Sequence, residues 1–168
     1  MGGEFGQSSE WNANGELEWW LLEAGPYHRG TQRFVQDLNK LYLAERVLWE
    51  MDYEQKGFYW VDTSDHANSI LCFARQDPDG RTPLVVMLNL TPVPRFRYRV
   101  GLPQPGQWRE VLNSDAAVYG GSNQGNLGGV TAEDFKCQHQ PYSALMTLPP
   151  LSIVVFQPEK PAESAPPA

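Results

Sequence analysis

Apolar side chains recur with a helical period in the first third of the chain. Between residues 28 and 52 they include Phe34 and Val35, then Leu38, then Leu41 and Tyr42, so that each group follows the one before by three or four positions. This spacing places them on one face of an α-helix. The sequence therefore predicts one amphipathic helix, followed by a second short helical turn at residues 47–51.

Two residues mark where this helix should begin. Proline is tolerated in the first turn of a helix, whereas glycine is unfavourable inside one. We therefore expect Pro26 and Gly30 to bracket the start of the helix.

From Gly57 onward the pattern changes to short runs of β-branched and aromatic residues, with Pro, Gly, Asn or Asp between them. About seven such runs are typical of a β-sandwich. The Asp79-Gly80 pair is typical of a tight hairpin, so the runs on either side of it should be neighbouring strands. The runs are GFYWVD, SILCFAR, PLVVMLNL, FRYRV, WREVL, ALMTL and SIVVFQ.

Alternation within these runs predicts which side chains are buried. In FRYRV, we expect Phe96, Tyr98 and Val100 to point into the core, and the two arginines between them to point to water. Trp60 lies inside the run GFYWVD, and we assign it to the core as well.

The remaining segments complete the predicted organisation. NSDAAVYGGSNQGNLGGVTAED is too polar and glycine-rich for a core, and it is long for a hairpin loop, so it is either a functional or a mobile surface loop. The last residues are rich in proline and lack apolar anchors. We predict a mainly β fold in three parts: a helical prefix (residues 1–56), an all-β sandwich domain (57–157) and a disordered tail (158–168).

The prefix has more apolar surface than one helix can cover. It contains Trp11, Trp19 and Trp20 besides the apolar helix face. A single helix cannot bury such a surface alone. We therefore expect a body outside this chain to cover it.

Charge and composition narrow the classes of partner. The chain has 13 basic and 20 acidic residues, a net charge of −7, which argues against nucleic acid and anionic membranes as partners. Cys72 and Cys137 lie far apart without a secretory leader, and no metal-binding spacing or bilayer-length apolar run occurs. We expect a reduced, cytoplasmic protein without a metal or membrane segment.

Several long motifs resemble the glycogen (1,4-α-glucan) branching enzymes of glycoside hydrolase family 13. MGGEFGQ, LEWWLLE and HRGTQRFVQDLNKLY are similar to the loop after the eighth strand of the catalytic (β/α)8 barrel and to the last barrel helix. LNLTPVPRFRYRVGLPQPGQWREVLNSDAAVYGGSNQGN and LPPLS are similar to the C-terminal β-sandwich. The resemblance runs from Met1 to about Phe156.

This resemblance implies a reaction and also a limit. Branching enzymes cleave an α-1,4 bond through a covalent glycosyl-enzyme and transfer the freed glucan to a 6-hydroxyl, without a cofactor. In the family, the catalytic carboxylates follow barrel strands that would precede Met1. The resemblance therefore implies no catalytic residue in this chain, which would have a structural or glucan-holding role. It also implies a missing N-terminal barrel portion as partner, and α-glucan such as glycogen or maltooligosaccharides as the ligand of the whole enzyme.

Two residues of the prefix are candidates for binding substrate. By the resemblance, Glu4 lies near the barrel site and could bond a sugar, or it could instead order its own loop through backbone N–H groups. Trp11 follows the same polar loop and could be a sugar platform, or it could pack like most tryptophans. In the polar loop of the sandwich, amides and hydroxyls suited to sugars occur at Tyr119, Ser122, Asn123 and Asn126.

Two other functions remain open from the sequence. The chain could be a free-standing carbohydrate-binding module that acts by binding alone. Alternatively, the exposed apolar face of the prefix could be a dimerisation element.

Overall fold

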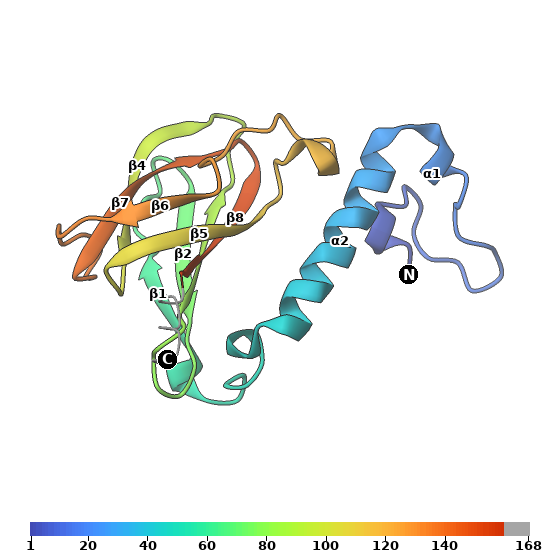
Figure 1. The fold of residues 1–168 in the computed structure, drawn as a ribbon. Coiled ribbons are helices and arrows are strands. Elements are labelled where there is room, and N and C mark those ends of the chain that lie inside the picture. The colour runs from blue at the N-terminus through green and yellow to red at the C-terminus, as the bar shows by residue number, and fades with distance from the viewer. Residues whose placement is uncertain (160–168) are drawn as a thin grey trace, which may run out of the picture.

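A computed structural model describes residues 1–159, which form a helical prefix beside a β-sandwich (Figure 1). The prefix contains α1 (Leu21–Ala24) and α2 (Pro26–Ala44). Short 3₁₀ turns occur at Gly3–Phe5, Arg46–Leu48, Gln55–Gly57 and Ala117–Tyr119. The strands are β1 (Phe58–Asp62), β2 (Ile70–Arg75), β3 (Leu84–Asn89), β4 (Arg95–Leu102), β5 (Gly106–Asn113), β6 (Gly129–Ala132), β7 (Tyr142–Leu148) and β8 (Ser152–Pro158).

The strands form two antiparallel sheets, which confirms the prediction of a mainly β fold. One sheet has six strands in the order β1-β2-β3-β8-β5-β6, and the other consists of β4 and β7. β2 and β3 are antiparallel neighbours, as the Asp79-Gly80 pair predicts. The main core lies between the sheets and includes Trp108, Met87, Phe156, Val100 and Met146.

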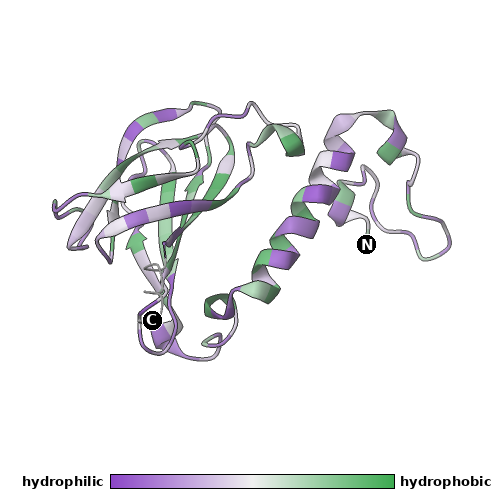
Figure 2. Cartoon of the chain, in the orientation of Figure 1, coloured by the Kyte–Doolittle hydropathy of each residue, from purple (hydrophilic) through white to green (hydrophobic). Residues whose placement is uncertain are grey.

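The six-stranded sheet is apolar on both faces, and this explains how α2 packs. β3 places Val85 and Met87 in the main core, whereas Leu84 and Val86 point to the opposite face. There they form a second cluster with β5, β8 and the partly buried Phe34 and Leu41 of α2. Hydrophobic and hydrophilic residues alternate along α2, as an amphipathic helix requires (Figure 2).

The sandwich therefore covers part of the helix face that we expected a separate body to cover. That expectation was wrong for the side of α2 that carries Phe34 and Leu41. Several other apolar side chains of the prefix remain exposed, among them Trp19, Trp20, Tyr27 and Leu43.

The prefix and the sandwich approach each other closely at Gly30. A Cβ atom at Gly30 would lie 2.1 Å from the carbonyl oxygen of Tyr119, in the loop that joins β5 to β6. In Figure 1 this loop reaches from the sandwich toward α2. Pro26 begins the helix as predicted, whereas Gly30 lies inside it. Glycine occupies this helical position because the close approach of Tyr119 leaves no room for a side chain.

Three details of the sandwich differ from the sequence prediction. Trp60 is 54% exposed, because it lies on the outer face of the edge strand β1, where Val61 is the buried residue. β6 pairs with β5 inside the stretch predicted to be loop. Pro158 ends β8, and the N–H of Glu159 donates to the Gln107 carbonyl, so order extends two residues into the predicted tail. The rest of that tail lies outside the described residues.

Candidate functional site

The polar loop of residues 114–128, between β5 and β6, is built around the buried carboxylate of Asp115. The carboxylate accepts hydrogen bonds from the backbone N–H of Ser122 (2.9 Å), the hydroxyl of Ser122 (2.7 Å) and the backbone N–H of Gln124 (3.0 Å). The Asp115 carbonyl accepts from the N–H of Asn123 at 2.8 Å. These four bonds tie the start of the loop to residues 122–124, so this part of the loop has a defined shape despite its glycine-rich composition.

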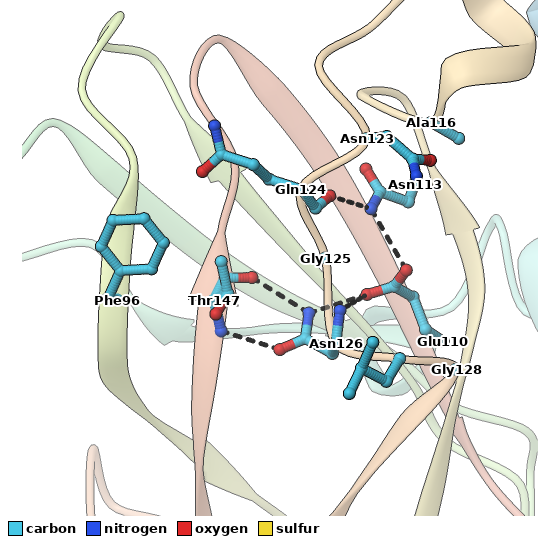
Figure 3. A pocket seen from close by; sticks show the side chains of 11 residues that line it. Phe96, Glu110, Asn113, Ala116, Asn123, Gln124, Gly125, Asn126, Gly128 and Thr147 are labelled. Atoms are coloured by element: carbon cyan, nitrogen blue, oxygen red, sulfur yellow. Dashed lines mark hydrogen bonds between the residues drawn. The ribbon is translucent and has the colours of Figure 1, made fainter.

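A second network joins this loop to both sheets. The Glu110 carboxylate on β5 accepts from the side-chain amides of Asn126 (2.7 Å) and Asn113 (3.1 Å). Asn126 also donates to the carbonyl of Thr147 on β7 (3.0 Å) and accepts from the Thr147 N–H (2.7 Å), as Figure 3 shows. Because β5 and β7 belong to different sheets, Asn126 fixes the loop across the edge of the sandwich.

These residues line a pocket of about 440 Å³ that also includes Phe96 of β4, and we call it the Phe96 pocket. Phe96 is 67% exposed, so the prediction that it points into the core was wrong. The pairing of β4 with β7 slips between Arg95 and Tyr98, and Arg97 has a φ of 54°. This bulge breaks the alternation and turns Phe96 outward.

One buried polar atom in the Phe96 pocket lacks a partner. The side-chain oxygen of Gln124 is buried and has no hydrogen-bond partner among residues 1–159. Its amide nitrogen donates to the Ser122 hydroxyl at 3.1 Å. In Figure 3 the side chain of Gln124 extends from the loop past Thr147 toward the side on which Phe96 lies. The pocket thus combines an exposed aromatic ring with a polar floor held by hydrogen bonds, and the unpaired Gln124 oxygen lies buried in its wall.

The two candidates from the prefix lie outside the Phe96 pocket. The Glu4 carboxylate accepts from the N–H of Gly2 at 2.9 Å. A hydrogen bond from its own backbone N–H lowers the pKa of Glu4, with a smaller contribution from the Gly2 N–H. Trp11 is 58% exposed. The roles of Glu4 and Trp11 in glucan binding stay predictions.

Sequence reasoning missed two of the residues that matter most here. Phe96 and Gln124 were not among the candidates, because the bulge that exposes Phe96 depends on the backbone angle of Arg97. Tyr119 was a candidate for sugar contact, but its hydroxyl donates to Asp37 on α2 at 3.0 Å. Asn126, also a candidate, lines the pocket with both side-chain groups engaged.

Neither a metal site nor a spanning helix occurs in the part of the chain that the structure describes. Among residues 1–159, no three His, Cys, Asp or Glu side chains are grouped so that they could hold a metal ion. No helix within these residues is long and apolar enough to cross a bilayer.

Comparison with known proteins identifies the domain. Residues 60–159 match the family "Alpha amylase, C-terminal all-beta domain". A solved structure, AmyP in complex with maltose, superposes with a TM-score of 0.50 over 82% of this chain and 22% of that chain. Its sequence identity is 15%, so this likeness shows the fold alone.

Curated relatives extend the match to the prefix. The 1,4-alpha-glucan branching enzyme GlgB of Aquifex aeolicus strain VF5 is 48% identical over 159 residues, or 95% of this chain and 25% of that protein. The GlgB of Burkholderia vietnamiensis strain G4 is 52% identical over 158 residues, covering 94% of this chain and 21% of that protein. The chain thus spans about a quarter of the length of these relatives. It belongs to the α-amylase C-terminal all-β domain family and is homologous to the C-terminal part of 1,4-alpha-glucan branching enzymes.

Proposed function

We propose that this chain works as the C-terminal section of a 1,4-α-glucan branching enzyme. The whole enzyme would cleave an α-1,4 bond of a glucan and transfer the freed chain to a 6-hydroxyl, forming an α-1,6 branch. The observation that carries this proposal is the 48–52% identity to two such enzymes over 94–95% of the chain, prefix included.

The section itself would be structural rather than catalytic. Retaining glucan chemistry needs two carboxyl groups about 5 Å apart, one on each side of the scissile bond. A (β/α)8 barrel builds such a site from the loops of several parallel strands. Every strand pair among residues 1–159 is antiparallel, so this part of the chain contains no such barrel.

The exposed side of the prefix supports contact with a larger body. α2 packs one side against the sandwich through Phe34 and Leu41. Trp20, Tyr27 and Leu43 remain exposed. Exposed apolar residues of this size favour a protein interface. We infer that the rest of the catalytic barrel packs here, so that the prefix forms the end of that barrel and the sandwich packs against it through α2.

A chimera tests this proposal. The matching quarter of the Aquifex aeolicus enzyme is replaced by this chain, and α-1,6 branches are measured by debranching amylose that the chimera has treated. The chimera should branch amylose, because the replaced section is homologous, and the 168-residue chain alone should not. The unmodified Aquifex enzyme is the control. A folded but inactive chimera, or branching by the chain alone, would contradict the proposal.

One observation favours the alternative, a free-standing carbohydrate-binding module. The Phe96 pocket has an exposed aromatic ring beside polar groups, as binding modules for sugars require. Glucan binding by the chain together with a folded, inactive chimera would favour this alternative.

A further inference from the structure

We propose that the Phe96 pocket is a binding subsite for a segment of α-1,4-glucan, separate from the catalytic barrel. The choice of α-glucan among neutral sugars rests on the proposed function. The volume of the pocket, about 440 Å³, lies within the range of small-molecule sites.

The first support is the exposure of Phe96. Regular alternation along β4 would place this ring in the core, beside Tyr98 and Val100. Instead, the strand accommodates a bulge and a left-handed Arg97, a conformation that is unfavourable for a residue with a side chain. Bulges that redirect a side chain are common next to functional sites. A ring exposed in this way offers its flat face to the C–H groups of a sugar.

The second support is the buried oxygen of Gln124. A buried acceptor without a partner is unfavourable, and native structures contain few of them. A rotation of the Gln124 side chain would bring this oxygen to the pocket surface, where a ligand hydroxyl would donate to it. Gln124 lines the same pocket as Phe96, so one ligand can meet both.

The third support is the rigidity of the pocket floor. Glu110, Asn113 and Asn126 form hydrogen bonds with one another, with the Gln124 carbonyl and with Thr147. They therefore hold the pocket in shape and need no rearrangement when a ligand binds, which favours affinity.

The charge of the pocket and of the chain favours a neutral ligand. Glu110 is the one ionisable residue among those that line the Phe96 pocket, and the whole chain carries a net charge of −7. An anion would be repelled, whereas a sugar combines hydroxyl groups with apolar C–H faces and carries no charge. This is the combination that Phe96 and Gln124 recognise.

Titration of the 168-residue chain with maltoheptaose, followed by calorimetry, tests the proposal. We expect saturable binding that is about tenfold weaker in Phe96→Ala, because the stacking face is lost. Phe96→Trp should retain binding, and Gln124→Ala should weaken it. Phe135→Ala is the matched control, since Phe135 is an exposed phenylalanine outside the pocket and should bind as the unmodified chain does. Unchanged far-ultraviolet circular dichroism and melting temperature show that each variant is folded.

Two results would overturn the subsite: the absence of maltoheptaose binding, or equal affinity in Phe96→Ala and the unmodified chain. These results are independent of the proposed function. An inactive chimera together with Phe96-dependent binding would remove the branching proposal and support the subsite. An active chimera whose affinity for amylose is unaffected by Phe96→Ala would support the branching proposal and remove the subsite.

Discussion

Tyr119 of the β-sandwich donates a hydrogen bond of 3.0 Å to the carboxylate of Asp37 on α2. The ring of Tyr119 also meets Phe34 edge to face, with ring centres 5.3 Å apart. Farther along, the side-chain amide of Gln157 on β8 donates to Glu45 just after α2, at 2.7 Å. The prefix and the sandwich are therefore joined by specific polar contacts in addition to the apolar cluster between them.

The bond between Tyr119 and Asp37 should make stability depend on pH. Hydrogen bonds from Lys40 and then from Tyr119 lower the pKa of Asp37. A carboxyl group with a lowered pKa in the folded state stabilises the protein above its unfolded pKa, and this stabilisation is lost as the pH falls through the folded pKa. Tyr119→Phe should lower the free energy of unfolding by about 1 kcal/mol near neutral pH. The difference should shrink below about pH 4.

Urea unfolding of both proteins at neutral and acidic pH measures this effect. Tyr53→Phe is the control, because Tyr53 is fully exposed and its loss should change nothing at either pH. A difference for Tyr119→Phe that stays constant as Asp37 is protonated would show that this bond does not depend on the charge.

Gly30→Ala should destabilise the chain although alanine is the better helix former. Alanine in a helix gains about 1 kcal/mol over glycine. Here its Cβ would lie 2.1 Å from a backbone oxygen, and backbone cannot move aside as a flexible side chain can. We expect a net loss of about 1–3 kcal/mol in the free energy of unfolding. Gly3→Ala, where a Cβ meets open space, should lie within about 0.5 kcal/mol of the unmodified chain. Stabilisation by Gly30→Ala would contradict the close contact.

Trp108 and Trp60 should respond very differently to truncation. Trp108 is fully buried between the sheets, and its ring N–H donates to the Gln104 carbonyl at 3.1 Å. Trp108→Ala should cost about 3–5 kcal/mol. Trp60 is half exposed and packs edgewise on Phe58, so Trp60→Ala should cost about 1 kcal/mol.

Guanidinium unfolding followed by circular dichroism measures both values. If Trp108→Ala does not fold, Trp108→Phe provides the comparison, because it keeps most of the buried ring and should still cost more than Trp60→Phe. Equal costs at the two positions would contradict the assignment of Trp108 to the core.

Asp115→Ala should loosen the loop of residues 114–128 more than the rest of the domain. Removal of the carboxylate leaves the Ser122 and Gln124 N–H groups without their acceptor, which costs about 1–3 kcal/mol. Hydrogen exchange should show faster exchange at these two amides, while β3 and β8 stay protected. Asp134→Ala, at an exposed position, is the control and should leave exchange in this loop unchanged.

Local patterns in the sequence predicted the elements that depend on neighbouring residues. The helical spacing from Phe34 to Tyr42 predicted α2, and the Asp79-Gly80 pair predicted the pairing of β2 with β3. The sequence pattern did not predict β6, because GVTA is four residues long and lies in a glycine-rich stretch.

The predictions that were wrong concern features that depend on contacts between distant segments. The outward position of Phe96 follows from a bulge in the pairing of β4 with β7, which alternation in FRYRV does not reveal. The place of Gly30 inside α2 follows from the position of Tyr119, far along the chain. The candidate site was predictable only as a polar loop, because the order of that loop depends on which donors reach Asp115.

The anchoring of this loop constrains how the domain can diverge. Tyr119 holds it against α2, Asp115 holds its start against residues 122–124, and Asn126 holds it on β7. Adding or removing a residue between any two of these anchors would pull one of them out of place. Homologous domains should therefore accumulate substitutions at outward positions such as Val118 and Leu127, while the length of this segment stays nearly constant.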